Sequence, residues 1–145
     1  RGSVDAWVIW DPYQAAAGRY LHARTSRDGR GGAESHQFYL ATKPYAEQHP
    51  KVIETLVDEV RNIGDWAKAN PDEVTQQVAP LLGLSPDITL TAVKRQGYGA
   101  QFLTPDVVNA QQKIADSFHQ LKLIPKPLVV KDVIWTPPAT VANAQ

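Results

Sequence analysis

Hydrophobic residues along the chain change their spacing near residue 42. Before that point they come in short runs. Residues 4–10 are rich in β-branched and aromatic side chains and are apolar on both faces after Asp5, which is typical of a buried strand in a parallel sheet. Residues 19–23 and 36–42 also have strand character. After residue 42 the apolar positions recur every three or four residues, as in amphipathic helices. The pattern therefore predicts an α/β segment followed by a mostly helical one.

A long amphipathic helix is predicted over residues 50–69. Its apolar positions recur at helical spacing, and acidic residues fall largely on the opposite side. The apolar positions are Val52, Leu56, Val60, Ile63 and Ala67. A stripe of this length needs a partner surface.

Shorter helices are predicted from local start signals. In three places a capping side chain precedes proline and an acidic residue, which favours the first turn of a helix. These signals begin at Asn70, Ser85 and Thr104 and predict helices over residues 71–82, 86–95 and 105–121, the first of them closed by Gly83. A further short helix is expected over residues 13–17, capped by Asp11 and ended by Gly18.

Glycine and proline mark the irregular parts of the chain. Residues 24–35 combine glycines and charges without a large apolar residue, so an exposed loop is expected. Prolines beyond Leu123 exclude helix and leave residues 128–130 and 133–135 as extended pieces. Residues 139–145 are expected to fray.

Composition narrows the classes of function. The chain has 145 residues, with 43% hydrophobic and 21% charged, which suits one globular domain. Its 15 basic and 15 acidic residues leave no net charge, which argues against a nucleic-acid partner. No apolar run approaches the roughly 20 residues of a membrane span. The first strands need further strands to form a stable sheet and the chain lacks methionine, so additional polypeptide is expected.

Catalytic and metal-binding motifs are not found in the sequence. There is no cysteine, and the 4 histidines have no metal-binding spacing, so no metal site or cofactor is predicted. Neither a nucleophile elbow nor a phosphate-binding loop is present, and no acid, base and nucleophile converge. The sequence therefore predicts a protein that is not an enzyme. An enzyme that uses Asp11 and a histidine is the weakest alternative.

Several segments together resemble a known family. The first is Val4-Asp5-Ala6-Trp7-Val8-Ile9-Trp10-Asp11-Pro12-Tyr13, followed at a distance by Phe38-Tyr39-Leu40-Ala41. Later segments agree, among them Leu81-Leu82-Gly83-Leu84, Leu123-Ile124-Pro125-Lys126 and Ile134-Trp135. Nearly end to end, the chain resembles the C-terminal half of the periplasmic aliphatic-sulfonate-binding proteins of bacterial ABC importers, which are related to taurine- and nitrate-binding proteins.

The resemblance implies a two-lobed periplasmic-binding-protein fold of type II. Residues 1–35 would end the second lobe, residues 36–42 would be a strand crossing the hinge, and residues 43–145 would complete the first lobe. A small organic sulfonate would bind between the lobes and pass to a membrane permease. By the same resemblance, the protein would be periplasmic or lipid-anchored outside the cytoplasm, and an N-terminal half would be missing from this chain.

Four residues are predicted to contact the ligand. Trp10 and Asp11 stand where a strand ends and a helix begins, the place at which open α/β sheets bind ligands. Trp10 would pack an alkyl chain, whereas Asp11 would cap the helix or bond a hydroxyl or amine, because its carboxylate repels a sulfonate. Phe38 and Tyr39 lie on opposite faces of one strand, so one of them is expected in the cleft.

Two other functions stay open. Nitrate, taurine or another small ligand could occupy a cleft of the same fold. Alternatively, residues 50–121 could form a helical interaction module, which an exposed stripe at Val52, Leu56 and Val60 would support.

Overall fold

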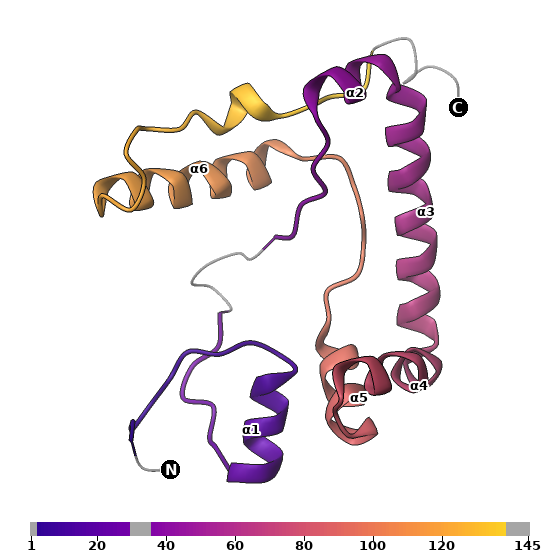
Figure 1. Cartoon of the computed structure of the whole chain (residues 1–145), viewed down its shortest axis with the longest axis vertical. Helices are drawn as coiled ribbons and strands as arrows, with labels where there is room; N and C mark the ends of the chain where they lie inside the picture. The colour runs from indigo at the N-terminus through magenta and orange to yellow at the C-terminus, as the bar shows by residue number, and fades with distance from the viewer. Residues whose placement is uncertain (1–2, 30–35, 139–145) are drawn as a thin grey trace. The chain divides into compact units, whose positions relative to one another are not determined.

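The computed structural model describes residues 3–29 and 36–138. Their regular elements are α1 (Tyr13–Leu21), α2 (Lys43–Gln48), α3 (Pro50–Ala69), α4 (Pro71–Leu82), α5 (Pro86–Arg95), α6 (Pro105–Gln120) and the short 3-10 helix η1 (Val130–Val133) (Figure 1). Contacts divide the chain into two compact units, which are described separately below. Unit 1 comprises Arg1–Asp28 and Arg61–Gly99, and unit 2 comprises Gly29–Val60 and Ala100–Gln145.

α4, α5 and α6 begin where the local start signals predict, whereas α2, over Lys43–Gln48, was not predicted. α3, α4 and α5 have the predicted bounds, and α6 ends one residue early, at Gln120. Gly83 closes α4 in the left-handed region, with φ of 64°, which glycine adopts without strain. The Thr104 hydroxyl accepts a hydrogen bond from the Val107 amide at 3.5 Å, so it caps α6 as predicted.

Two of the three predicted caps are wrong. Asn70 and Ser85 occupy the N-cap positions of α4 and α5, but neither side chain accepts a capping hydrogen bond there. The side-chain amide of Asn70 instead donates to the Trp66 carbonyl at 2.8 Å. The Ser85 hydroxyl lies 3.4 Å from the Tyr20 hydroxyl. The Asn70 side chain therefore bonds the preceding helix, and the Ser85 hydroxyl contacts the side chains of Tyr20 and Asp87 instead of a backbone amide of α5.

The first helix is longer than predicted. α1 continues through Gly18 to Leu21 and ends at His22, which has a φ of 53°. The predicted strand over residues 19–23 is therefore wrong. A helical glycine costs only about 1 kcal/mol relative to alanine, and α1 is supported by contacts with α5. Arg19 on the added turn forms an ion pair with Asp87 at 3.0 Å.

The other two predicted strands form no ladder. Residues 4–10 and 36–42 are neither helix nor strand. A strand exists only through hydrogen bonds to a neighbouring strand, and no described segment pairs with either of them. The hinge-crossing role of residues 36–42 and the division of the chain into lobes remain predictions. Residues 24–29 are exposed, as expected of a loop. Residues 30–35 and 139–145, predicted as loop and frayed end, lie outside the described residues.

The core of unit 1 forms where α5 packs against α4 and α1. Ile88 and Thr89 are 1% exposed, and the Thr89 hydroxyl donates to the Ser85 carbonyl at 3.1 Å. Apart from Val93, the other buried residues here are small: Ala15, Ala17, Thr75 and Ala79. Small side chains let the helix backbones approach closely, so α1 is held tightly on α5.

Unit 2 contains a contact between α6 and the chain that follows it. The Gln112 side chain donates to the Leu128 carbonyl and accepts from the Val130 amide, both at 2.8 Å. Val130 is buried at 4% exposure. Residues 130–133 then turn into η1, so the predicted extended conformation is wrong at Val130 and Val133, whereas Val129 and Ile134 are extended. The Asp132 amide closes this turn on the Val129 carbonyl at 3.1 Å.

The Gln112 amide therefore holds the C-terminal segment on α6. In the Gln112→Ala variant the buried Val130 N–H loses its acceptor, which costs about 1–3 kcal/mol. We expect the Val130 amide to exchange with solvent at least about tenfold faster, measured by native-state hydrogen exchange. Gln111→Ala, one position earlier on the same helix, is the matched control. An unchanged exchange rate in Gln112→Ala would show that the segment is held by packing alone.

α3 has the predicted length but no buried residue. The exposed fractions of Val52, Leu56 and Ile63 are 49%, 46% and 58%. The apolar stripe is thus largely open to solvent.

Candidate functional site

The turn that starts α1 positions two of the predicted site residues. The Trp10 carbonyl accepts from the Gln14 amide at 3.0 Å, and an Asp11 carboxylate oxygen accepts from the Ala15 amide at 3.0 Å. The peptide bond between Asp11 and Pro12 is cis. The Asp11 carboxylate thus bonds the first turn of the helix, but α1 begins at Tyr13 with Pro12 as its N-cap, so the predicted N-cap at Asp11 is one residue too early.

Asp11 also forms a contact with the far end of α5. Both of its carboxylate oxygens lie 3.4 Å from the Arg95 Nη1 atom, which also donates to the Gln14 side-chain oxygen. The Asp11 side chain is 26% exposed and that of Arg95 is 49% exposed. Sequence reasoning missed Arg95, because 84 positions separate it from Asp11.

Trp10, which precedes Asp11 in the sequence, presents an apolar surface. Its side chain is 70% exposed, and its ring meets that of Tyr13 edge to face, with centroids 6.4 Å apart and an interplanar angle of 77°. Tyr13 is a second residue that sequence reasoning missed. Its position three residues after Trp10, across the start of a helix, is the signal that could have identified it. The two rings form one aromatic wall next to Asp11.

A hollow of about 230 Å³ lies beside Asp11 and Pro12 in unit 1. Its wall is mainly apolar and comes from α4 and α5, with Val74, Val78, Leu82, Ala92 and Val93. Asp11 is the only charged residue in its lining. The volume is below the range of about 300–1,000 Å³ of small-molecule sites, so the hollow can take only part of a ligand.

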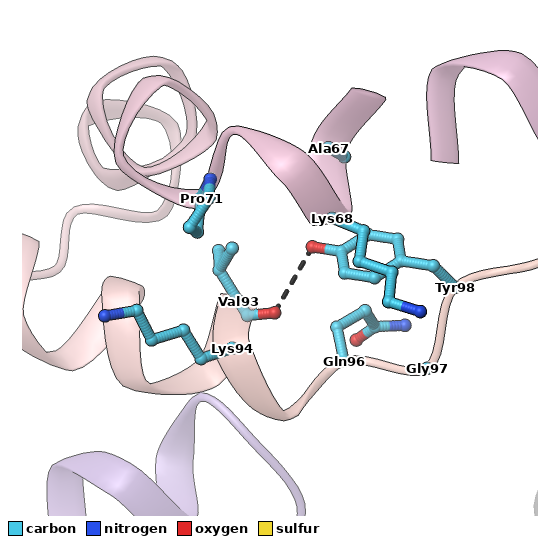
Figure 2. A pocket seen from close by; sticks show the side chains of 8 residues that line it. All are labelled: Ala67, Lys68, Pro71, Val93, Lys94, Gln96, Gly97 and Tyr98. Carbon is cyan, nitrogen blue, oxygen red and sulfur yellow. Dashed lines mark hydrogen bonds between the residues drawn. The ribbon is translucent and has the colours of Figure 1, made fainter. Parts of the chain in front are cut away.

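A second hollow of about 390 Å³ lies nearby and includes Lys68, Lys94, Gln96 and Tyr98 (Figure 2). The Tyr98 hydroxyl donates to the Val93 carbonyl at 3.2 Å. Figure 2 shows the two lysine side chains pointing to opposite sides of this hollow. They do not converge on a common point, so this arrangement lacks the paired cations of an anion site.

Phe38 and Tyr39 belong to unit 2, whereas Trp10 and Asp11 belong to unit 1. Phe38 is 38% exposed and Tyr39 is 70% exposed. The Phe38 ring is tilted at 55° to the His36 ring, with centroids 6.4 Å apart. Their predicted contact with a ligand stays a prediction, and so do those of Trp10 and Asp11.

Electrostatics at the α1–α5 contact are set by local partners. A hydrogen bond with Ser85, and then the ion pair with Arg19, lowers the pKa of the Asp87 carboxyl below its ordinary value.

Residues 3–29 and 36–138 contain no group of three or more His, Cys, Asp or Glu side chains placed to hold a metal ion. Among the helices of those residues, none is both long and apolar enough to cross a bilayer.

Comparison with known proteins confirms the resemblance found in the sequence. The chain is 30% identical over 138 residues to a protein of Escherichia coli assigned as an aliphatic sulfonates-binding protein, and 28% identical over 134 residues to one of Bacillus subtilis. These matches cover 94% and 92% of the chain. The chain spans less than half the length of these relatives, 43% and 40%. No protein-family model matches it.

Solved structures show the same similarity in three dimensions. The chain superimposes on the periplasmic aliphatic sulphonate binding protein SsuA of Escherichia coli with a TM-score of 0.84 and 28% identity, covering 94% of the chain and 45% of that structure. It also matches the alkanesulfonate-binding protein SsuA of Xanthomonas axonopodis pv. citri, solved with MOPS bound, with a TM-score of 0.81 and 27% identity. The fold is therefore part of a periplasmic-binding-protein fold, as predicted.

Proposed function

We propose that this chain is part of the substrate-binding component of an ABC importer, and that its ligand is a small organic sulfonate. One observation carries the proposal: similarity to aliphatic sulfonate-binding proteins extends over 94% of the chain, in sequence and in structure. A match confined to the helices would reflect helical periodicity alone. This match includes nearly all of the chain, so it extends to the segment that carries Trp10 and Asp11.

The aromatic wall would cover the apolar part of the ligand. Trp10 and Tyr13 together offer exposed ring surface beside a polar turn, which suits a ligand with an alkyl chain and a charged head. Backbone N–H groups at helix N-termini would hold the sulfonate, since they carry partial positive charge. Phe38 and Tyr39 are proposed as further residues that contact the ligand.

The proposed function requires more than this chain. Trp10 is 70% exposed here, and ligands of binding proteins are mostly enclosed. We propose that a further N-terminal half, corresponding to the part of the relatives that the chain does not match, closes the cleft. The loaded protein would deliver its ligand to a membrane permease, from the periplasm or from a lipid anchor outside the cytoplasm. Binding without catalysis is proposed for all of these residues.

A helical interaction module is the second candidate. The half-exposed stripe of α3 favours it, because such a face is available to a partner. Nitrate, taurine or another small ligand is the alternative within the same fold. Titration calorimetry with different ligands separates these possibilities.

The test uses the joined protein, defined here as the chain fused after the part of the Escherichia coli relative that it does not match. Titration calorimetry with alkanesulfonates of increasing length should give saturable heat, and the sulfonate should be recovered unchanged. Heat with nitrate or an amine, but none with any sulfonate, would overturn the ligand and keep the fold. A folded joined protein that binds none of these would favour the interaction module.

A further inference from the structure

Asp11 poses an electrostatic problem for a sulfonate site. Its carboxylate adjoins Trp10 in sequence and is the only charged group that lines the hollow beside it. A sulfonate bound along Trp10 would bring a second negative charge close to the first. Like charges at such short range repel by an amount that reduces affinity severalfold or more, unless a cation offsets one of them.

We propose that Arg95 is a positioning residue of this site and balances the charge of Asp11, so that an anionic ligand can approach Trp10. The identity of that ligand rests on the proposed function. The balance of charge rests on geometry alone. The Arg95 Nη1 atom lies 3.4 Å from each Asp11 carboxylate oxygen, within reach of both.

The orientation of Asp11 is fixed from two sides. One carboxylate oxygen accepts from the Ala15 amide, which ties the side chain to the first turn of α1. Arg95 reaches it from the last turn of α5 and also contacts the Gln14 side chain. The Asp11 side chain is 26% exposed, so solvent screens its charge only in part. The cation that offsets it must therefore come from the protein.

Stability alone does not account for this arrangement. An ion pair with an arginine that is 49% exposed contributes only about 0–1 kcal/mol to folding. α1 and α5 already share a second ion pair, between Arg19 and Asp87 at 3.0 Å. What distinguishes the Arg95 pair is its place at the Trp10 turn. Arg19 therefore provides a matched control, because its pair spans the same two helices away from that turn.

The first experiment measures the local potential in the chain itself, without a ligand. Trp10 is made the only tryptophan by Trp7→Phe, Trp66→Phe and Trp135→Phe, and circular dichroism confirms that each variant retains its helices. The fluorescence of Trp10 is then quenched by iodide, which is an anion, and by acrylamide, which is neutral. In Arg95→Gln we expect the ratio of the iodide to the acrylamide quenching constant to fall about two- to threefold at low salt. Arg19→Gln should leave the ratio unchanged.

Rescue separates charge balance from a structural role. Adding Asp11→Asn to Arg95→Gln removes the uncompensated charge, so the quenching ratio should return to its original value. Arg95→Lys keeps a cation and should preserve the ratio. If Arg95→Gln leaves the ratio unchanged, or if Asp11→Asn does not restore it, the inference is wrong whatever the ligand proves to be.

The second experiment measures binding in the joined protein. Arg95→Gln should weaken an alkanesulfonate on the order of tenfold at low salt, less at high salt, and the double variant with Asp11→Asn should recover most of the loss. An unchanged affinity in Arg95→Gln would overturn the inference and leave the proposed function standing. If the parent joined protein binds no sulfonate but the quenching ratios change as expected, the proposed function is wrong and the inference about Arg95 stands.

Discussion

Replacement of Trp10 by alanine is expected to weaken the binding of alkanesulfonates to the joined protein about thirtyfold. Truncation of an aromatic anchor in a desolvated pocket typically costs about 2 kcal/mol or more. The loss should grow with the length of the alkyl chain, because the contact scales with the apolar area that the indole covers. Calorimetric titration of Trp10→Ala with a short and a long sulfonate measures both effects.

Trp66→Ala is the matched control for this prediction. Trp66 lies on α3 and is 36% exposed, so its loss should lower stability without any dependence of affinity on chain length. Equal affinities of the parent and Trp10→Ala for short and long sulfonates, in a folded protein, would place the site away from Trp10.

The second large effect is expected from joining the chain to the remainder of the binding protein. We expect the joined protein to bind alkanesulfonates at least about 100-fold more tightly than the chain alone, a difference of about 2.7 kcal/mol. In the chain alone Trp10 is 70% exposed, and the hollow lined by Asp11 and Pro12 measures about 230 Å³. A ligand there would keep much of its apolar surface in water, so little hydrophobic free energy would be gained.

Parallel titrations of the chain and the joined protein check this expectation. Trp10→Ala should reduce affinity strongly in the joined protein and weakly in the chain, since only the enclosed indole is desolvated. Equal affinity of the chain and the joined protein would show that residues 1–145 contain a complete site, and the proposed interlobe cleft would then be wrong.

On its own, the Asp11 carboxylate would repel a sulfonate. In the structure that carboxylate is bonded to Arg95 and to the Ala15 amide. Trp10 can therefore serve as an apolar wall for an anionic ligand without an uncompensated charge beside it.

Local signals in the sequence determined most of the helices. α3, α4 and α5 begin at a proline, and their apolar spacing continues to the predicted last residue. Such signals act within one or two turns, because capping groups, proline and the helix dipole affect only neighbouring residues. Similar reasoning located the turn at Trp10 and Asp11, which begins a helix as expected. The family resemblance was also readable from the sequence, because it rests on the order of short motifs.

Contacts between distant segments decided the rest. Gly18 reads as a stop signal, yet α1 passes through it, because α5 supports the last turn through Asp87. Residues 128–130 are held by Gln112, and Asp11 is balanced by Arg95, 84 positions away. Neither of these two interactions can be predicted from a repeating pattern in the sequence, because each depends on a single side chain reaching a distant segment. The predicted strands show the same limit: residues 4–10 and 36–42 have the composition of strands, but a ladder needs a neighbour, and only tertiary structure supplies one.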